Sequence, residues 1–220
     1  MKNINTRYLR WGIIISLVCA LLIFIFAFAL GNEKSFLLLN ADLGKTTDTI
    51  FFYTTFLGDG FIWLALFLFT WFLLKRKDAL LLIVSTFLLS TTFVQLFKYI
   101  IAPDTLRPIK FIQDTSLIHT VPGVTIHTVS SFPSGHAATA FCIYLLLCML
   151  VQKKWWLLIG LMYALLVSYS RIYLAQHFPE DIGGGIITAI VSVVVSYVLT
   201  QNFYHNKKSK KTMYAGTKIS

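Results

Sequence analysis

The chain has 220 residues, of which 57% are hydrophobic and only 13% are charged. A soluble domain carries about a quarter charged residues, so this composition excludes an ordinary soluble globular domain. The formal net charge of +10 would suggest nucleic-acid binding in a soluble protein, but here the basic residues gather in short segments between long apolar runs. That distribution is typical of membrane topology, and we expect no nucleic-acid partner.

Six apolar runs are each approximately long enough to cross a bilayer, whose hydrocarbon core takes about 20 helical residues. They cover residues 11–30, 50–74, 79–101, 134–151, 155–174 and 182–201. No internal linker rich in Gly, Pro or Ser separates them. We therefore predict an all-α, polytopic bundle of six transmembrane helices over residues 1–201, with a basic cytoplasmic tail over residues 202–220.

The connecting segments alternate in charge. The N-terminus, the second and fourth connections and the tail carry +3, +2, +2 and +5, or +12 together, whereas all other charges sum to −2. Because basic loops stay in the cytoplasm, both termini are predicted to be cytoplasmic. An alternative for the first run is a signal peptide cleaved after Ala27-Phe28-Ala29, which would leave five spans in the same orientation.

Ionisable residues beside membrane spans are costly and are therefore functional candidates. In the predicted topology a set of them shares the outer membrane face, where the third and fifth spans end and the fourth and sixth begin. The set comprises Lys98, Arg107, His136, Arg171, His177 and Asp181. Pro133 and Pro179 stand at the starts of the two helices, and Ser134 is placed as an N-cap or first-turn residue. Two helix N-termini and three cations predict an anion site, and phosphate fits best.

The two histidines suggest a phosphoryl-transfer mechanism. His177 can take a phosphoryl group if a carboxylate orients its ring, and Asp181 lies four residues further along a predicted helix start. Glu180 is the competing partner, with a less suitable helical phase. His136 can protonate the leaving oxygen and then activate water. No Asp, Glu or His cluster has metal-ligand spacing, so we expect no metal and no cofactor.

These residues resemble the three-part signature of the type 2 phosphatidic acid phosphatase (PAP2) family. The second part matches Pro133-Ser134-Gly135-His136, and the third matches Ser170-Arg171 followed by His177 and Asp181. In the first part, eight residues separate Lys98 from Arg107-Pro108, where the family usually has a lysine six residues before the Arg-Pro pair; Lys110 is the alternative lysine.

The resemblance implies a six-helix membrane fold, with His177 as nucleophile, Asp181 as its orienting group and His136 as acid and base. It also implies phosphate binding by Lys98, Arg107, Ser134, Gly135 and Arg171. The expected protein is a phosphatase of a bacterial inner membrane, with its active site extracytoplasmic. Its partners are the bilayer and a lipid phosphate or isoprenoid diphosphate substrate; the oligomeric state stays open.

Two other functions use the same sequence features. A phosphotransferase would pass the phosphoryl group to an acceptor other than water, and a non-enzymatic lipid-binding or transport protein would retain only the fold. The presence of both histidines and Asp181 favours an enzyme.

Two further features of the sequence each have more than one interpretation. Asp59 is interpreted as interfacial, or as lining substrate access, and the loop 103–133 as a lid, a headgroup reader or a merely solvated loop.

Overall fold

The computed structural model describes residues 5–216, and this part of the chain contains helices and no β-strand. The α-helices are α1 Arg7–Leu30, α2 Asn32–Leu39, α3 Lys45–Thr54, α4 Phe61–Leu68, α5 Leu80–Leu96, α6 Pro108–Phe111, α7 Gly135–Val151, α8 Trp156–Tyr173 and α9 Pro179–Gly216. Short helical turns are η1 Thr55–Gly58, η2 Phe69–Leu73, η3 Lys77–Ala79, η4 Phe97–Ile101 and η5 Thr115–Leu117. The all-α prediction is confirmed.

The spans are less regular than the six continuous helices that were predicted. Within the described residues, four helices are long and apolar enough to cross a membrane, and the bent pair α3–η1 and α4–η2 makes a fifth if it counts as one span. The fourth predicted span, α7, is apolar but has only 17 residues. These helices make the chain an integral membrane protein, whereas the count of six stays a prediction.

The expectation of one continuous second span over 50–74 is wrong. The helical segment begins at Lys45 and is interrupted at Asp59 and Gly60, where the two halves meet at an angle of 65°. The helix breaks because the backbone of Asp59 is extended, with φ −78° and ψ 166°. Directly before it, a Cβ added at Gly58 would lie 2.7 Å from Val167 Cγ1 and 3.0 Å from His136 Cβ. The chain passes directly against α7 and α8 here, and only glycine permits that approach.

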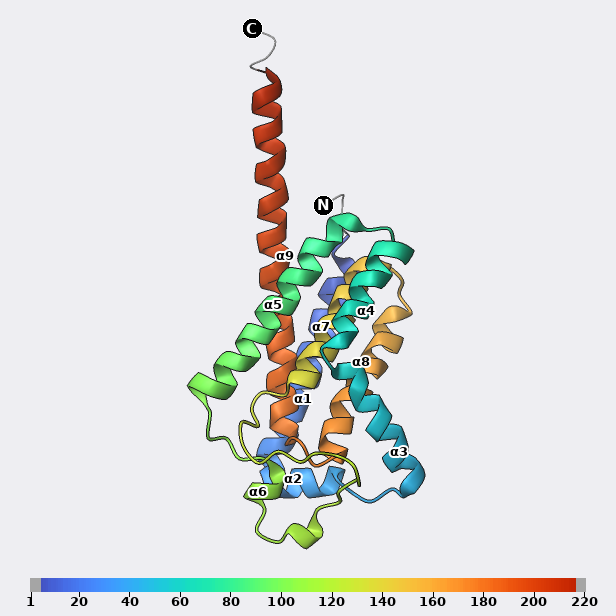
Figure 1. Cartoon of the computed structure of the whole chain (residues 1–220), viewed down its shortest axis with the longest axis vertical. Helices are drawn as coiled ribbons and strands as arrows, with labels where there is room; N and C mark the ends of the chain where they lie inside the picture. The colour runs from blue at the N-terminus through green and yellow to red at the C-terminus, as the bar shows by residue number, and fades with distance from the viewer. Residues whose placement is uncertain (1–4, 217–220) are drawn as a thin grey trace.

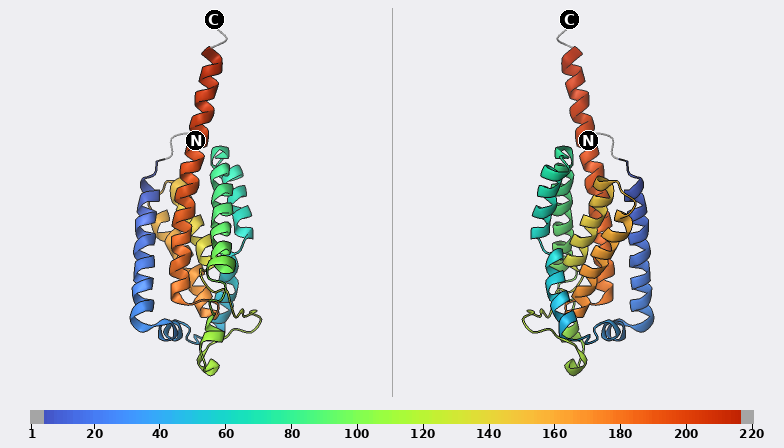
Figure 2. Two further views of the ribbon diagram at one scale, coloured as in Figure 1. Left: turned by 90° about the vertical axis from the view of Figure 1, so that its left-hand side faces the viewer. Right: turned by 90° about the vertical axis from the view of Figure 1, so that its right-hand side faces the viewer.

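Helix α7 forms the centre of the bundle. Thirteen of its residues are buried, and it packs against α1, α5, α8 and α9. Figure 2 shows α1 and α5 on opposite sides of α9. The outer helices expose large apolar side chains such as Leu21, Leu22 and Phe28 on α1, as expected of a surface that meets lipid tails.

The starts of α7 and α9 are in backbone contact. A Cβ added at Gly185 would lie 2.6 Å from the carbonyl oxygen of Ser134, and one added at Gly184 would lie 2.4 Å from the ring of Phe132. The amide of Ser134 also donates to the backbone oxygen of Asp181 over 2.9 Å. The glycines therefore bring together the two helix N-termini that were predicted to bind an anion.

The two ends of the bundle differ (Figure 1). The beginning of α1, the α4–α5 connection and the far part of α9 lie toward one end, and α2, α6 and the long loop 103–133 lie at the other. The loop is tied to the helices, because Asn40 bonds both the amide and the carbonyl of His119, and Gln176 donates to the carbonyl of Thr125. These hydrogen bonds hold the loop in place at this end of the bundle.

Candidate active site

His177 and Asp181 face each other in the turn that leads into α9. His177 Nδ1 lies 3.2 Å from Asp181 Oδ2, and both side chains are buried. The same carboxylate oxygen accepts the Phe178 amide over 2.8 Å and the Ser131 hydroxyl over 2.5 Å. The competing carboxylate, Glu180, instead accepts a bond from the Asn32 side chain. Asp181 thus engages Nδ1, which leaves Nε2 as the ring nitrogen available for attack.

The surroundings of His177 keep its ring neutral. Burial lowers the pKa of His177 well below its usual value, and the positive charges of Arg107, Lys98 and Arg171 lower that pKa further. A neutral imidazole is the form that has a lone pair for phosphorus. All three predicted cations therefore lie close enough to His177 for their charges to act on its pKa.

Arg107 is held rigidly beside the nucleophile candidate. Its Nε donates to the carbonyl of Val129 over 3.0 Å, and its Nη1 donates to both the backbone and the side-chain oxygen of Gln176. Burial lowers the pKa of Arg107. Gln176 was not among the predicted site residues, because its burial follows only from the fold; the usable signal was its place directly before His177.

Arg171, at the end of α8, has a donor that no other described residue satisfies. Its Nη1 donates to Thr55 Oγ1 over 2.6 Å, while its buried Nε has no hydrogen-bond partner. Leaving a buried charged donor unpaired is costly unless a ligand completes its bonds. The guanidinium is therefore held from one side by Thr55 and is available to an anion through Nε.

Lys98 lies in the π-helical turn η4, and its charge acts on His177. A π-turn takes up an additional residue relative to an α-helix, so the longer spacing to Arg107 is compatible with bringing the ammonium toward the site. Lys110, the alternative, is exposed on α6. This geometry favours Lys98 over Lys110 as the lysine of the site.

The start of α7 supplies the other predicted groups. The Ser134 hydroxyl accepts a hydrogen bond from the Ala137 amide and caps the helix. Gly135 is the first residue of the helix. His136 Nε2 lies 2.8 Å from Asp59 Oδ1, and both residues line a cavity of about 340 Å³. Asp59, interpreted from the sequence as interfacial or as lining substrate access, is thus a neighbour of the second histidine and lines a cavity.

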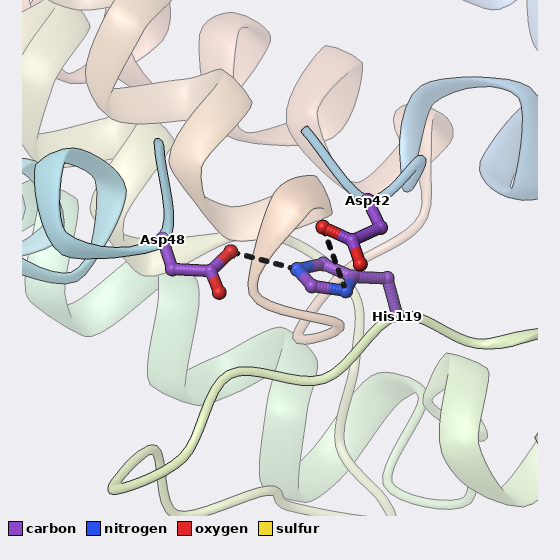
Figure 3. Close-up of side chains that lie close together, drawn as sticks. All are labelled: Asp42, Asp48 and His119. Atoms are coloured by element: carbon purple, nitrogen blue, oxygen red, sulfur yellow. Dashed lines mark hydrogen bonds and ion pairs between the residues drawn. The ribbon is translucent and has the colours of Figure 1, made fainter. Parts of the chain in front are cut away.

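One further group of side chains has metal-ligand character. Asp42, Asp48 and His119 offer ligand atoms within 4.8 Å of one another (Figure 3). His119 Nε2 already lies 2.9 Å from Asp48 Oδ1, which also accepts the Tyr173 hydroxyl. The three residues come from separate segments of the chain, so their spacing in the sequence is not that of metal ligands. As they stand, they form a hydrogen-bonded link between α3, α8 and the loop.

The apolar helices, the two histidine–aspartate pairs and the cations that act on one of them define an integral membrane protein with a candidate active site for an anionic substrate. The sequence belongs to the PAP2 superfamily, whose family model matches residues 78–205. The chain is 30% identical over 189 residues to an undecaprenyl-diphosphatase of Sulfolobus acidocaldarius, covering 81% of this chain and 85% of that protein.

Two further comparisons agree with this assignment. A lipid A 4′-phosphatase of Bacteroides thetaiotaomicron is 39% identical over 56 residues, or 26% of this chain and 25% of that protein. The crystal structure of Aquifex aeolicus LpxE superimposes with a TM-score of 0.65 at 28% identity, covering 76% of this chain and 94% of that one.

Proposed function

We propose that this protein is a membrane-embedded lipid phosphate phosphatase that hydrolyses a phosphomonoester or diphosphate lipid through a phosphohistidine intermediate. The observation that carries the proposal is the environment of His177, which is buried, neutral and engaged through Nδ1 by Asp181. The phosphatase names of two relatives, undecaprenyl-diphosphatase and lipid A 4′-phosphatase, support the reaction class and the lipid nature of the substrate.

In the first step, the lone pair of His177 Nε2 forms a bond to phosphorus. The bond from phosphorus to the leaving oxygen breaks, and that oxygen keeps the electron pair and takes a proton from His136. Asp181 holds the Nδ1 proton of the resulting phosphohistidine. Arg107, Arg171 and Lys98 stabilise the charge on the equatorial oxygens, which is why we propose a reaction without a metal.

In the second step, His136 takes a proton from water while the water oxygen attacks phosphorus. The bond from phosphorus to His177 breaks, orthophosphate forms, and the imidazole regains its lone pair. The same histidine is therefore acid in one step and base in the next.

An apolar cavity supports a lipid-linked substrate. Its volume is about 340 Å³, and its lining includes Phe24 of α1, Phe97 of η4, Phe132 and Ile187 of α9. Phe132 lies two residues before Ser134, so the cavity adjoins the predicted phosphate site. We propose that it receives part of the substrate's hydrocarbon chain.

We further propose six spans in a bacterial inner membrane, both termini in the cytoplasm and the site at the extracytoplasmic face. The charge asymmetry supports this orientation, because the basic α4–α5 connection lies at the end of the bundle opposite the long loop. Positive connections are retained on the cytoplasmic side.

The test is phosphate release by purified protein from phosphatidic acid, phosphatidylglycerophosphate, undecaprenyl diphosphate and lipid A. Release from at least one lipid, lost in His177→Ala and kept in His205→Ala, supports the proposal; His205 is an exposed histidine of α9. Transfer of the phosphoryl group to an added alcohol without free phosphate would identify a phosphotransferase instead. No turnover of any lipid would contradict enzymatic function.

Rapid-quench measurements separate the roles of the two histidines. His177→Ala should release no nitrophenol from nitrophenyl phosphate, since no leaving group replaces the attacking nitrogen. His136→Ala should lose about 10²–10⁴-fold in the first turnover of an alkyl phosphate but much less with nitrophenyl phosphate, because nitrophenolate leaves without a proton. A nitrophenol burst from His177→Ala would reverse the assignment.

A further inference from the structure

The break between α3 and α4 places a carboxylate on His136. Asp59 Oδ1 lies 2.8 Å from His136 Nε2, and both side chains are partly exposed to the cavity that they line. The backbone of Asp59 is extended, with φ −78° and ψ 166°, and the residue lies between the end of η1 and the start of α4. A continuous helix through this position would not have these dihedral angles, so the break itself directs the carboxylate.

The carboxylate is not needed to cap the helix that follows. The Ile62 and Trp63 amides in the first turn of α4 bond to the backbone oxygens of Asp59 and Gly60. Nor does Asp59 belong to the ion pair or hydrogen bonds of the His177 centre described above. Its direct contact is with His136, and the charge of Arg171 acts on it as well.

The backbone around Asp59 is fixed against the same histidine. A Cβ at Gly58 would lie 3.0 Å from both Cβ and Cδ2 of His136, and the Thr55 hydroxyl at the other end of η1 accepts the Arg171 bond. The segment Thr55–Asp59 therefore contacts a phosphate-binding candidate and the proton-donor candidate. The position of the carboxylate follows from packing that involves both.

We propose that Asp59 is a positioning residue that orients His136 and stabilises its protonated form for protonation of the leaving group, an inference that rests on the proposed phosphatase function. A carboxylate within hydrogen-bonding distance favours an imidazolium and fixes its ring. Since Asp59 engages Nε2, the transferred proton comes from Nδ1. It passes to the leaving oxygen as the bond to phosphorus breaks, and the ring remains as neutral imidazole paired with Asp59.

The site then contains two histidine–aspartate pairs of opposite arrangement. Asp181 engages Nδ1 of His177 and leaves Nε2 for nucleophilic attack, while Asp59 engages Nε2 of His136 and leaves Nδ1 for proton transfer. The adjoining cavity, which also has Gln95 and Thr139 in its wall, offers space on the side of the proton donor for the departing group.

The experiment compares Asp59→Asn, Asp59→Glu and the control Asp104→Asn, which removes an exposed acid of the loop. First-turnover rates are measured with an alkyl phosphate and with nitrophenyl phosphate. Asp59→Asn should lower the rate of alkyl phosphate cleavage by about 10–10²-fold and spare cleavage of nitrophenyl phosphate. The reason is that only the alkoxide leaving group needs a proton. Asp59→Glu should recover part of the loss, and Asp104→Asn should match the wild type.

Inhibition by orthophosphate is measured in parallel and should stay within about twofold of the wild type, because the direct contact of Asp59 is with His136 and the phosphate-binding candidates are unchanged. Asp59→Asn added to His136→Ala should cost nothing further, as expected of a residue that works through the other. If Asp59→Asn does not accumulate, Asp59→Ser provides the same comparison with a second neutral side chain.

Equal losses on both substrates, or an alkyl phosphate rate equal to that of the wild type, would overturn the positioning role. A further loss in the double variant would do the same. If wild-type protein cleaves neither substrate, the proposed function fails, and that outcome is distinct because it appears before any variant is compared.

Discussion

Arg107 is hydrogen-bonded to Gln176, the residue directly before His177. The guanidinium Nη1 donates to the backbone oxygen of Gln176 over 3.0 Å and to its side-chain oxygen over 3.2 Å. Both residues are buried. A positive charge from the long loop is thereby held beside the turn that carries His177, where it disfavours protonation of the ring.

The pH dependence of catalysis should report this charge. His177 must be neutral to attack, so the acid limb of kcat/KM should lie below pH 6.5, the ordinary imidazole value. Arg107→Gln removes a cation, raises the pKa of His177 and should move the limb to higher pH. Arg107→Lys keeps the charge and should leave the limb nearer that of the wild type.

Substrate ionisation is common to all three proteins, so the comparison between them isolates the enzyme group. His136, Lys98, Arg171 and Asp181 also act near His177 and are unchanged in both variants. A limb that does not move in Arg107→Gln would contradict the neutral-nucleophile assignment.

Arg171→Lys should be strongly impaired. The guanidinium binds Thr55 through Nη1 and is proposed to bind the phosphate through its unpaired Nε, whereas an ammonium cannot hold both directions at once. Loss of one such donor typically costs about 10²–10³-fold in turnover. The matched control is Arg76→Lys, since Arg76 pairs with Asp78 in the α4–α5 connection. Wild-type turnover of Arg171→Lys at normal protein level would make Arg171 a structural anchor only.

The orientation can be tested by labelling single cysteines in intact cells. Thr120 and Asn206 are both exposed, one in the long loop and the other on α9. In a background without Cys19, Cys142 and Cys148, which are free thiols in the structure, an impermeant maleimide should label Thr120→Cys and not Asn206→Cys. After permeabilisation both should react. The reverse pattern would place the site in the cytoplasm.

Activity should survive chelation by EDTA, because cationic side chains are proposed to neutralise the phosphate charge. The assay needs a soluble short-chain substrate, so that divalent ions do not act through lipid aggregation. If EDTA abolishes turnover and a divalent ion restores it, the metal-free mechanism is wrong. Asp42→Asn, which alters the group around His119, would then show whether that group holds the ion.

The sequence predicted the contacts that follow from local geometry. A spacing of four at a helix start is enough to bring Asp181 to His177, and helix phase correctly disfavoured Glu180. Contacts between segments that are distant in the sequence cannot be predicted from residue spacing. Thr55 meets Arg171 across 116 positions, and Ser131 reaches Asp181 across 50.

The bend at Asp59 was missed for a related reason. Its surroundings are apolar on both sides, so hydropathy alone extends one helix through it. The two flanking glycines were a weak signal of a break, but the close approach to His136 that requires Gly58 exists only in the folded bundle.

The glycine contact between α7 and α9 determines which parts of the protein can move. Backbone atoms already in contact cannot be rearranged by rotamer changes, so we expect these two helix starts to move as one rigid body around the proposed phosphate site. Helix α5 continues into η4, which meets this body through side chains such as the ring contact between Phe97 and Phe132. Side-chain contacts can slide and reform, so α5 is where the opening that admits a bulky lipid should be sought.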